Sequence, residues 1–103
     1  MKRAEPEIEV HHNAAASRFE AAVEGQLCVA DYLLAGNVMR MHHTEVPVAL
    51  EGRGIAAELV RAALAHAEAN GQRVEPRCAY VRAYMRRHPE TQRLLPDDFP
   101  PLR

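Results

Sequence analysis

The fold of this chain is constrained most by a glycine-bearing turn that separates a strand pattern from a helix pattern. Residues 38–46 have the composition of a strand, and Pro47 ends or deflects it because proline lacks the N–H that a sheet ladder needs. Gly52 and Gly54 follow, and glycine lets a backbone turn tightly or approach a bulky group. From Ile55 onward, apolar residues recur at intervals of three and four, which predicts an amphipathic helix. The chain therefore runs strand, glycine turn, helix.

The start of this helix is also a candidate anion site. The first N–H groups of a helix have no partner within it, and the helix dipole is positive at that end, so a phosphate is favoured there. Glycines that serve only to turn the chain would give the same pattern. The turn by itself therefore leaves both interpretations open.

Four segments ahead of the turn carry strand patterns. Residues 8–13 alternate apolar and polar side chains, and residues 27–34 and 38–46 are rich in residues that suit a pleated surface. Residues 17–23 fit either a strand or a short helix, but hairpin chemistry at residues 24–26 favours the strand. Strands joined by such short turns predict an antiparallel meander.

The second half of the chain is expected to contain two helices and one more strand. The first helix runs from Ile55 to a cap at Gly71. Residues 73–76 form a short fifth strand that can pair in parallel with the fourth, since a helix connects the two. Residues 79–87 carry a second helical stripe, which ends before Pro89. The predicted fold class is α/β (α+β), with a mostly antiparallel sheet and a strand–glycine turn–helix–strand–helix C-terminal half.

Length, charge and composition narrow the class of protein. A chain of 103 residues, 48% of them hydrophobic and 26% charged, is expected to form one globular domain. A net charge of −1 gives no reason to expect a nucleic acid or an anionic membrane as a partner. No apolar run approaches the roughly 20 residues that span a bilayer, and no apolar segment follows the charged N-terminus as in a signal peptide. Cys28 and Cys78 do not suggest a disulfide scaffold, so a reducing, cytoplasmic setting is expected.

Cys78 is the most informative candidate for chemistry. It follows the fifth predicted strand and begins the second predicted helix, where the helix dipole lowers the pKa of a thiol. Arg77 and Arg82 add positive charge nearby. A buried, inert thiol is the alternative for Cys78, and it is the expectation for Cys28, which lies within a strand.

His43 and Glu45 form a second candidate pair. They lie two residues apart on one strand and share a face, so one of them could take a proton from an incoming amine. A solvated or cross-strand pair is the alternative. His42 and His43 point to opposite faces of their strand, as do His11 and His12, and we therefore expect no metal site.

The order of the elements, with Gly52-Arg53-Gly54-Ile55-Ala56 at the junction of strand and helix, resembles the GNAT N-acetyltransferase superfamily. In that superfamily, an acetyl-CoA loop of the form Gln/Arg-x-x-Gly-x-Gly/Ala binds the pyrophosphate mainly through backbone N–H groups. Gly54 and Ala56 fill the last two fixed positions here. Glu51 departs from the first, and its carboxylate would lie near phosphates of like charge. The resemblance implies an acetyl-CoA loop made of Glu51, Gly52, Arg53, Gly54, Ile55 and Ala56.

A closer resemblance is to a minimal GNAT-like family of small single-domain proteins. It rests on four segments in the same order and spacing, namely residues 43–47, 52–56, 76–81 and 87–90. The resemblance covers about residues 8–95 and implies a single acetyl-CoA-binding domain in residues 1–103. This family lacks the helices that larger GNAT enzymes place after their first strand, and the sequence has no long helix pattern before residue 52.

The resemblance also implies roles for individual side chains. Val46 lies where GNAT enzymes use a splayed strand end to hydrogen-bond the pantetheine arm. Cys78 lies where the small family places a cysteine close to the CoA thiol. Tyr84 falls near the position of a tyrosine that protonates the leaving thiolate, although its place on the apolar stripe also fits core packing. Arg87 belongs to a basic helix face that either meets CoA phosphates or is solvated.

Taken together, the roles implied by the resemblance are those of an acyltransferase. Such a domain would bind acetyl-CoA as co-substrate and transfer the acetyl group to an amine on an unidentified small molecule or protein. Holding the thioester and the amine together would supply most of the rate, and Cys78 could take the acetyl group first. The alternatives are a non-catalytic acyl-CoA-binding or protein-interaction module, since so short a chain leaves little sequence for an acceptor pocket, and a domain without a ligand.

Overall fold

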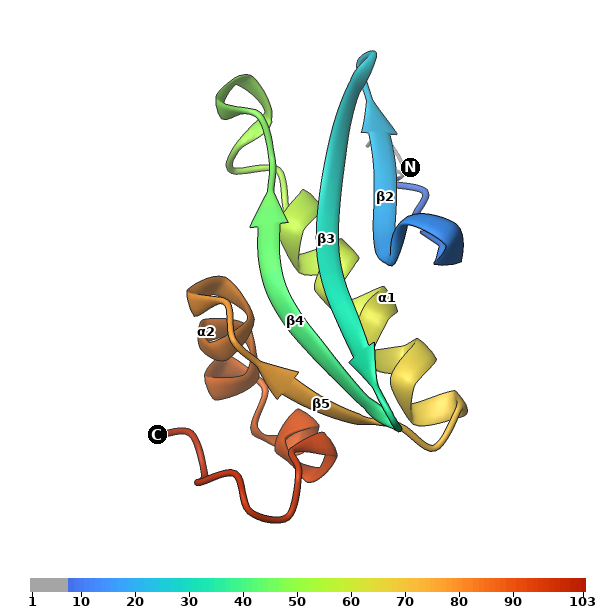
Figure 1. Ribbon diagram of the computed structural model, residues 1–103. Coiled ribbons are helices and arrows are strands. Elements are labelled where there is room, and N and C mark those ends of the chain that lie inside the picture. Colours follow the sequence, from blue (N-terminus) through green and yellow to red (C-terminus); the bar gives the residue numbers. More distant parts are fainter. Residues whose placement is uncertain (1–7) are drawn as a thin grey trace, which may run out of the picture.

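A computed structural model describes residues 8–103, which form one five-stranded sheet and two α-helices (Figure 1). The strands follow one another in the sheet in sequence order. They are β1 (His11–Asn13), β2 (Arg18–Val23), β3 (Gln26–Ala35), β4 (Val38–Glu45) and β5 (Arg73–Pro76). The helices are α1 (Ile55–Ala69) and α2 (Ala79–Arg87), with 3-10 turns η1 (Ala14–Ala16), η2 (Val48–Leu50) and η3 (Pro89–Leu94).

Strands β1 to β4 form the antiparallel meander that the sequence predicts. Within the ambiguous segment 17–23, residues 18–23 form a strand, because they pair with β3 and set Phe19 opposite Ala30 in the core. The first strand is shorter than predicted and begins only at His11. The residues before it alternate because Ile8 and Val10 pack against the core, without being paired in the sheet.

Strand β5 pairs in parallel with β4, as predicted, after the crossover through α1. The pairing is brief and ends where Met41 lies opposite Pro76. The Met41 carbonyl then accepts hydrogen bonds from the N–H groups of Arg77, at 2.9 Å, and of Cys78, at 3.0 Å, as the chain turns into α2. In the described part of the chain, the last four residues of β4 therefore have no strand partner on the β5 side.

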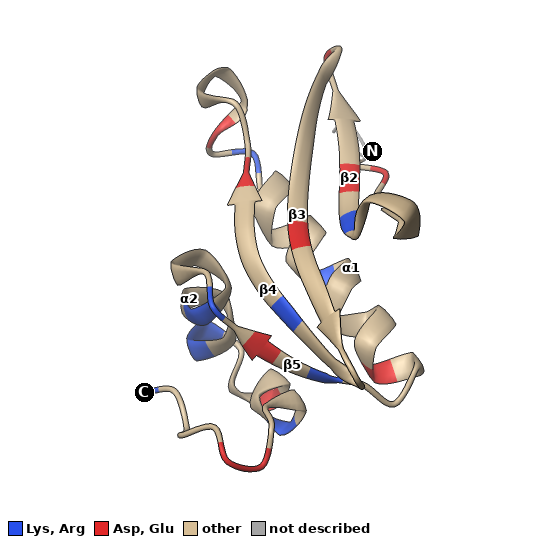
Figure 2. Cartoon of the chain, viewed as in Figure 1, with Lys and Arg blue, Asp and Glu red and all other residues tan. Residues whose placement is uncertain are grey.

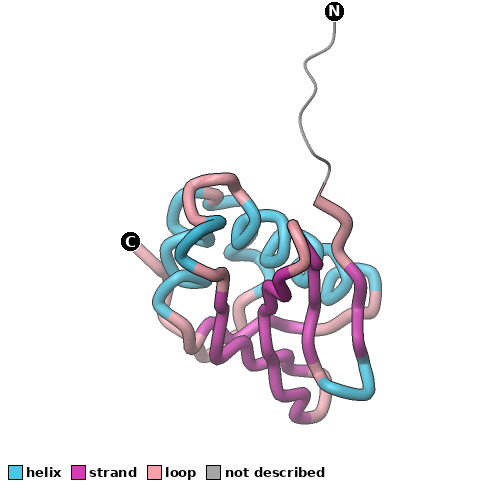
Figure 3. Tube along the Cα trace, turned by 90° about the horizontal axis from the view of Figure 1, so that it is seen from above, coloured by secondary structure: helices cyan, strands magenta, loops and turns pink. Residues whose placement is uncertain are grey.

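One apolar core joins the sheet to the helices. The predicted stripe of α1 is buried, and Met39 and Met41 meet it from β4 with no exposed surface. Helix α2 adds Val81, Tyr84 and Met85 to the same core. Seen from above, the helices gather on one side of the strands (Figure 3). Within residues 8–103, no helix has the length and apolar character to cross a bilayer.

The opposite face of the sheet, which we call the outer face, carries charged residues together with the exposed side chains of Leu27 and Leu33. Figure 2 shows acidic and basic positions on the neighbouring strands β2, β3, β4 and β5. They form ion pairs across the strands, such as Arg18 with Asp31 at 2.9 Å and Arg40 with Glu75 at 3.0 Å. A bulge between β3 and β4 makes His42 an extra residue in β4, because the register shifts between Asp31 and Tyr32.

Candidate functional site

The unpaired end of β4 opens into a cavity of about 480 Å³, which we call the groove. Because the β4–β5 ladder stops at Met41, no strand within residues 8–103 pairs with the backbone of β4 beyond this point on that side. The groove is lined by the end of β4 (Thr44, Glu45 and Val46), the turn before α1 (Leu50, Glu51, Gly52 and Gly54) and the starts of the two helices (Ala56 and Tyr80).

The glycine turn brings the start of α1 to the groove. Gly52 and Gly54 have φ angles of +84° and +79°, in the left-handed region that glycine occupies without strain. Gly54 is the N-cap of α1, and no side chain of the described residues caps the helix there. The first N–H groups of α1 are therefore available to an anion. A Cβ built on Gly54 would meet nothing within 4 Å, so this approach is open.

The loop residues predicted from the sequence divide into two groups. Glu51 lies on the wall of the groove with the glycines and Ala56, as the resemblance implies. Ile55 is buried in the core, so only its backbone can serve a ligand. Arg53 is turned aside, because its Nη1 donates a hydrogen bond of 2.6 Å to the carboxylate of Glu24 in the β2–β3 turn.

Cys78 lies beside the groove at the N-cap of α2, as predicted. Its Sγ is 3.6 Å from Oγ1 of Thr44, which lines the groove. Burial acts to raise the pKa of the Cys78 thiol, but hydrogen bonds with the Thr44 side chain and with the backbone of Val81, Tyr80 and Thr44 outweigh it and lower the pKa. Hydrogen bonds therefore lower the pKa of this thiol, including those from the first turn of α2 that the sequence also indicated, whereas the arginines expected to assist are not among the causes.

Cys28 differs from Cys78 in every respect that matters for reactivity. It has no exposed surface, and burial raises the pKa of its thiol. The expectation that Cys28 is an inert core residue fits this environment.

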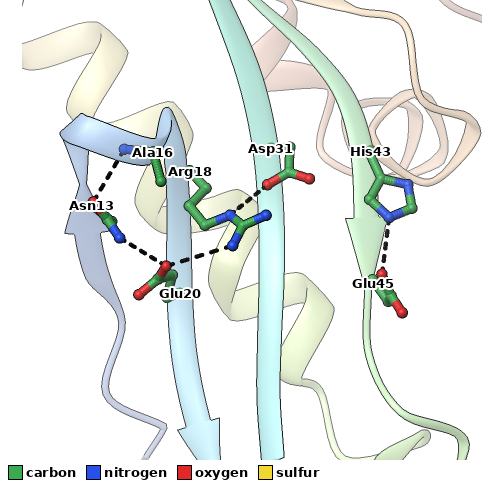
Figure 4. A network of polar contacts seen from close by, with 7 residues as sticks. All are labelled: Asn13, Ala16, Arg18, Glu20, Asp31, His43 and Glu45. Carbon is green, nitrogen blue, oxygen red and sulfur yellow. Dashed lines mark hydrogen bonds and ion pairs between the residues drawn. The ribbon is translucent and has the colours of Figure 1, made fainter.

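His43 and Glu45 are brought together on the outer face at the edge of the groove. His43 Nε2 lies 3.2 Å from Glu45 Oε1, and Glu45 also lines the groove (Figure 4). A carboxylate accepts hydrogen bonds, so the tautomer of His43 with its hydrogen on Nε2 would donate to Glu45 and present Nδ1 as the proton acceptor. Arg18 and Asp31 form a neighbouring ion pair on the same face.

Two residues predicted to bind the cofactor lie away from the groove. Tyr84 is 7% exposed and lines a separate hollow of about 350 Å³ between α1 and η3, where its ring stacks on His88 with centroids 4.2 Å apart. Burial is the main reason that the pKa of Tyr84 is raised. Arg87 is exposed at the C-terminal end of α2, whereas the N-terminal end of this helix meets the groove. Roles for both in binding CoA stay predictions.

Tyr80 is the groove residue that the sequence did not single out. It lies on the first turn of α2, two residues after Cys78, and it lines the groove. The signal was available, because a helix that begins at the site must present its first turn there. Among residues 8–103, the structure contains no group of three or more side chains suited to hold a metal ion.

Comparisons with known proteins agree with this fold. Residues 18–94 match the sequence profile of the GCN5-related N-acetyl-transferase family. Protein NATD1 from Gallus gallus and from Mus musculus is 32% identical over 90 residues, which cover 84% of this chain and 82% of each relative. The solution structure of a GCN5-like protein from Staphylococcus aureus has the same fold, with a TM-score of 0.68 at 20% identity, covering 86% of this chain and 88% of that one.

Proposed function

The chain belongs to the GCN5-related N-acetyltransferase family, and we propose that it binds acetyl-CoA in the groove and transfers the acetyl group to an amine. One observation carries this proposal. The free edge of β4 and the uncapped start of α1 border one cavity, so donors for a pyrophosphate and a strand edge for an extended amide chain lie side by side. An extended ligand with a charged end and an amide-bearing arm fits this pair of features.

We assign the parts of the ligand by their chemistry. The backbone N–H groups after Gly54 suit the pyrophosphate, because they are fixed donors at the positive end of a helix. The chain at Thr44 and Val46, beyond the part of β4 that pairs with β5, suits the pantetheine amides. These amides would hydrogen-bond to the backbone there as an added strand does. The thioester would then lie toward Thr44 and Cys78, at the closed end of the strand pair.

Direct transfer requires a neutral amine beside the thioester. The amine nitrogen attacks the thioester carbonyl carbon, the C–S bond breaks, and the sulfur leaves with the electron pair as the CoA thiolate. His43, oriented by Glu45, accepts the proton that the amine loses, and the thiolate takes up a proton from solvent. Both side chains are exposed on the outer face, where an amine can reach them from solvent.

Transfer through Cys78 is the second route. The Cys78 thiolate would attack the thioester carbonyl, release CoA as the thiolate and carry the acetyl group as a new thioester. The amine would then attack that thioester and give up a proton to solvent, and the broken C–S bond would regenerate the Cys78 thiolate, which the hydrogen bonds around it stabilise. The acetyl acceptor is an amine-bearing small molecule or protein in either route.

Transfer of isotopically labelled acetyl groups to a panel of polyamines, amino acids and lysine peptides tests the proposal. Wild-type protein should label at least one amine, and His43→Gln should lower kcat while leaving CoA affinity unchanged. His11→Gln, which alters an exposed histidine at the opposite edge of the sheet, is the matched control.

The alternative is a non-catalytic acyl-CoA-binding module, favoured by an outer face that no helix of residues 8–103 covers. Tight CoA binding without transfer to any amine would support this module and reject the acetyltransferase. Failure to bind CoA at millimolar concentration would reject both.

A further inference from the structure

The β2–β3 turn contains a backbone conformation that its residue does not favour. Glu24 has a φ of +51° and Gly25 a φ of +75°, the pair of positive angles found in tight hairpin turns. Asparagine, aspartate and glycine are the usual residues at such positions, and a glutamate there is strained. Backbone strain of this kind is often found where the side chain has a functional role.

The carboxylate of Glu24 is bound to the glycine turn. Its Oε2 accepts a hydrogen bond of 2.6 Å from Nη1 of Arg53, although the two residues lie 29 positions apart in the chain. Both turns lie at the same end of the sheet (Figure 1). Arg53 stands between Gly52 and Gly54, which both line the groove, and its own side chain does not line it.

Two carboxylates consequently act against an anionic ligand in different ways. Glu51 lies on the wall of the groove, and Glu24 pairs with Arg53, the one cation among residues 51–54. Exposed ion pairs of this kind are weak, and the exposed fractions of the Arg53 and Glu24 side chains are 42% and 59%. A phosphate binds a guanidinium more strongly, through paired charge-assisted hydrogen bonds, and can therefore displace the carboxylate.

We propose that Glu24 is a latch that withholds Arg53 from the groove, and that the phosphates of the bound ligand release it. The latch rests on the proposed function, because it requires a phosphate-bearing ligand at the glycine turn. Glu24 then sets the affinity for that ligand without touching it. Ligands without phosphates gain nothing from the release of Arg53, so Glu24 lowers the affinity for CoA and leaves the affinity for its uncharged fragment pantetheine unchanged.

Calorimetry with CoA on four variants tests the latch. Glu24→Gln keeps the size of the side chain and removes its charge, and it should lower the Kd for CoA about two- to fivefold, the range of an exposed ion pair. The same substitution made together with Arg53→Gln should bind no more tightly than Arg53→Gln alone. Glu68→Gln is the matched control, because Glu68 forms a comparable exposed pair with Arg93 at 2.6 Å beside the other hollow.

Each outcome is decisive. An unchanged or higher Kd in Glu24→Gln would overturn the latch. Tighter binding that persists without Arg53 would also overturn it, since Glu24 would then act by plain repulsion of the phosphates. Tighter binding of pantetheine by Glu24→Gln would contradict the need for phosphates. If wild-type protein and Glu24→Gln both fail to bind CoA, the proposed function and the latch fall together, whereas an unaltered Kd in a binding-competent protein removes the latch alone.

Discussion

Gly54 offers the sharpest test of where the phosphates bind. Gly54→Ala adds a single methyl group, and the open space around this position means that no neighbouring atom in the folded protein is displaced. The remaining cost is backbone strain, because alanine at a φ of +79° loses about 1–2 kcal/mol relative to glycine. For a domain of this size, each kcal/mol lowers Tm by about 4–8 °C.

The effect on binding should exceed this loss of stability. The methyl group would stand at the N-cap of α1, between the free N–H groups and an incoming pyrophosphate. Losing one charge-assisted hydrogen bond costs about 1.5–3 kcal/mol, which corresponds to a Kd for CoA about ten to 150 times higher. Calorimetry well below Tm measures this change in a folded sample.

Gly36→Ala is the matched control for this strain. Gly36 has a φ of +61° and equally open surroundings, but it lies in the β3–β4 turn at the start of β4, roughly 25 Å from the groove by the length of that strand. It should lower Tm by a similar amount and leave the Kd for CoA unchanged. An equal Kd in both variants, whether raised or not, would show that the phosphates bind elsewhere.

The charge of Glu51 tests the same site in the opposite direction. Glu51→Arg should tighten CoA binding, because a bidentate phosphate partner replaces a repelling carboxylate; unchanged affinity would show that this side chain points away from the phosphates. Cys78 should react with iodoacetamide faster than Cys28 near neutral pH, and CoA should protect it; equal rates would contradict the lowered pKa of Cys78. Protein stability should fall as the pH drops below 6.5, because burial and then His66 lower the pKa of His12 in the folded state, so that the unfolded chain binds the proton first. Denaturant titrations should show a flatter pH dependence in His12→Asn, and an unaltered dependence would assign the effect to other groups.

Local patterns in the sequence predicted most of the fold. The spacing of apolar residues located α1, and the glycines on either side of Arg53 located the turn before it, because burial on one helix face and positive φ angles leave direct traces in composition. The position of Cys78 followed from the same local logic, since the end of β5 and the start of α2 both fall within a few residues.

Contacts between residues far apart in the sequence could not be predicted from local patterns. Nothing near Arg53 in the sequence indicates that Glu24 binds it, because the contact depends on where two turns meet in space. Tyr80 and Tyr84 illustrate the same limit. They are four residues apart and chemically identical, so they share a face of α2. Their positions along the helix axis decide that Tyr80, in the first turn, lines the groove while Tyr84, one turn further on, lines the other hollow.

The groove and the reactive thiol share one structural origin. Pro76 brings no N–H to the ladder, so β5 cannot extend its pairing with β4, and the two following N–H groups converge on the carbonyl of Met41. This turn leaves the edge of β4 beyond Met41 without a strand partner in the described part of the chain, and at the same time sets Cys78 against Thr44. A ligand that uses the free edge must therefore pass close to the thiol. A change that extends the β4–β5 ladder would close the groove and remove the hydrogen bond that lowers the pKa of Cys78 in a single step.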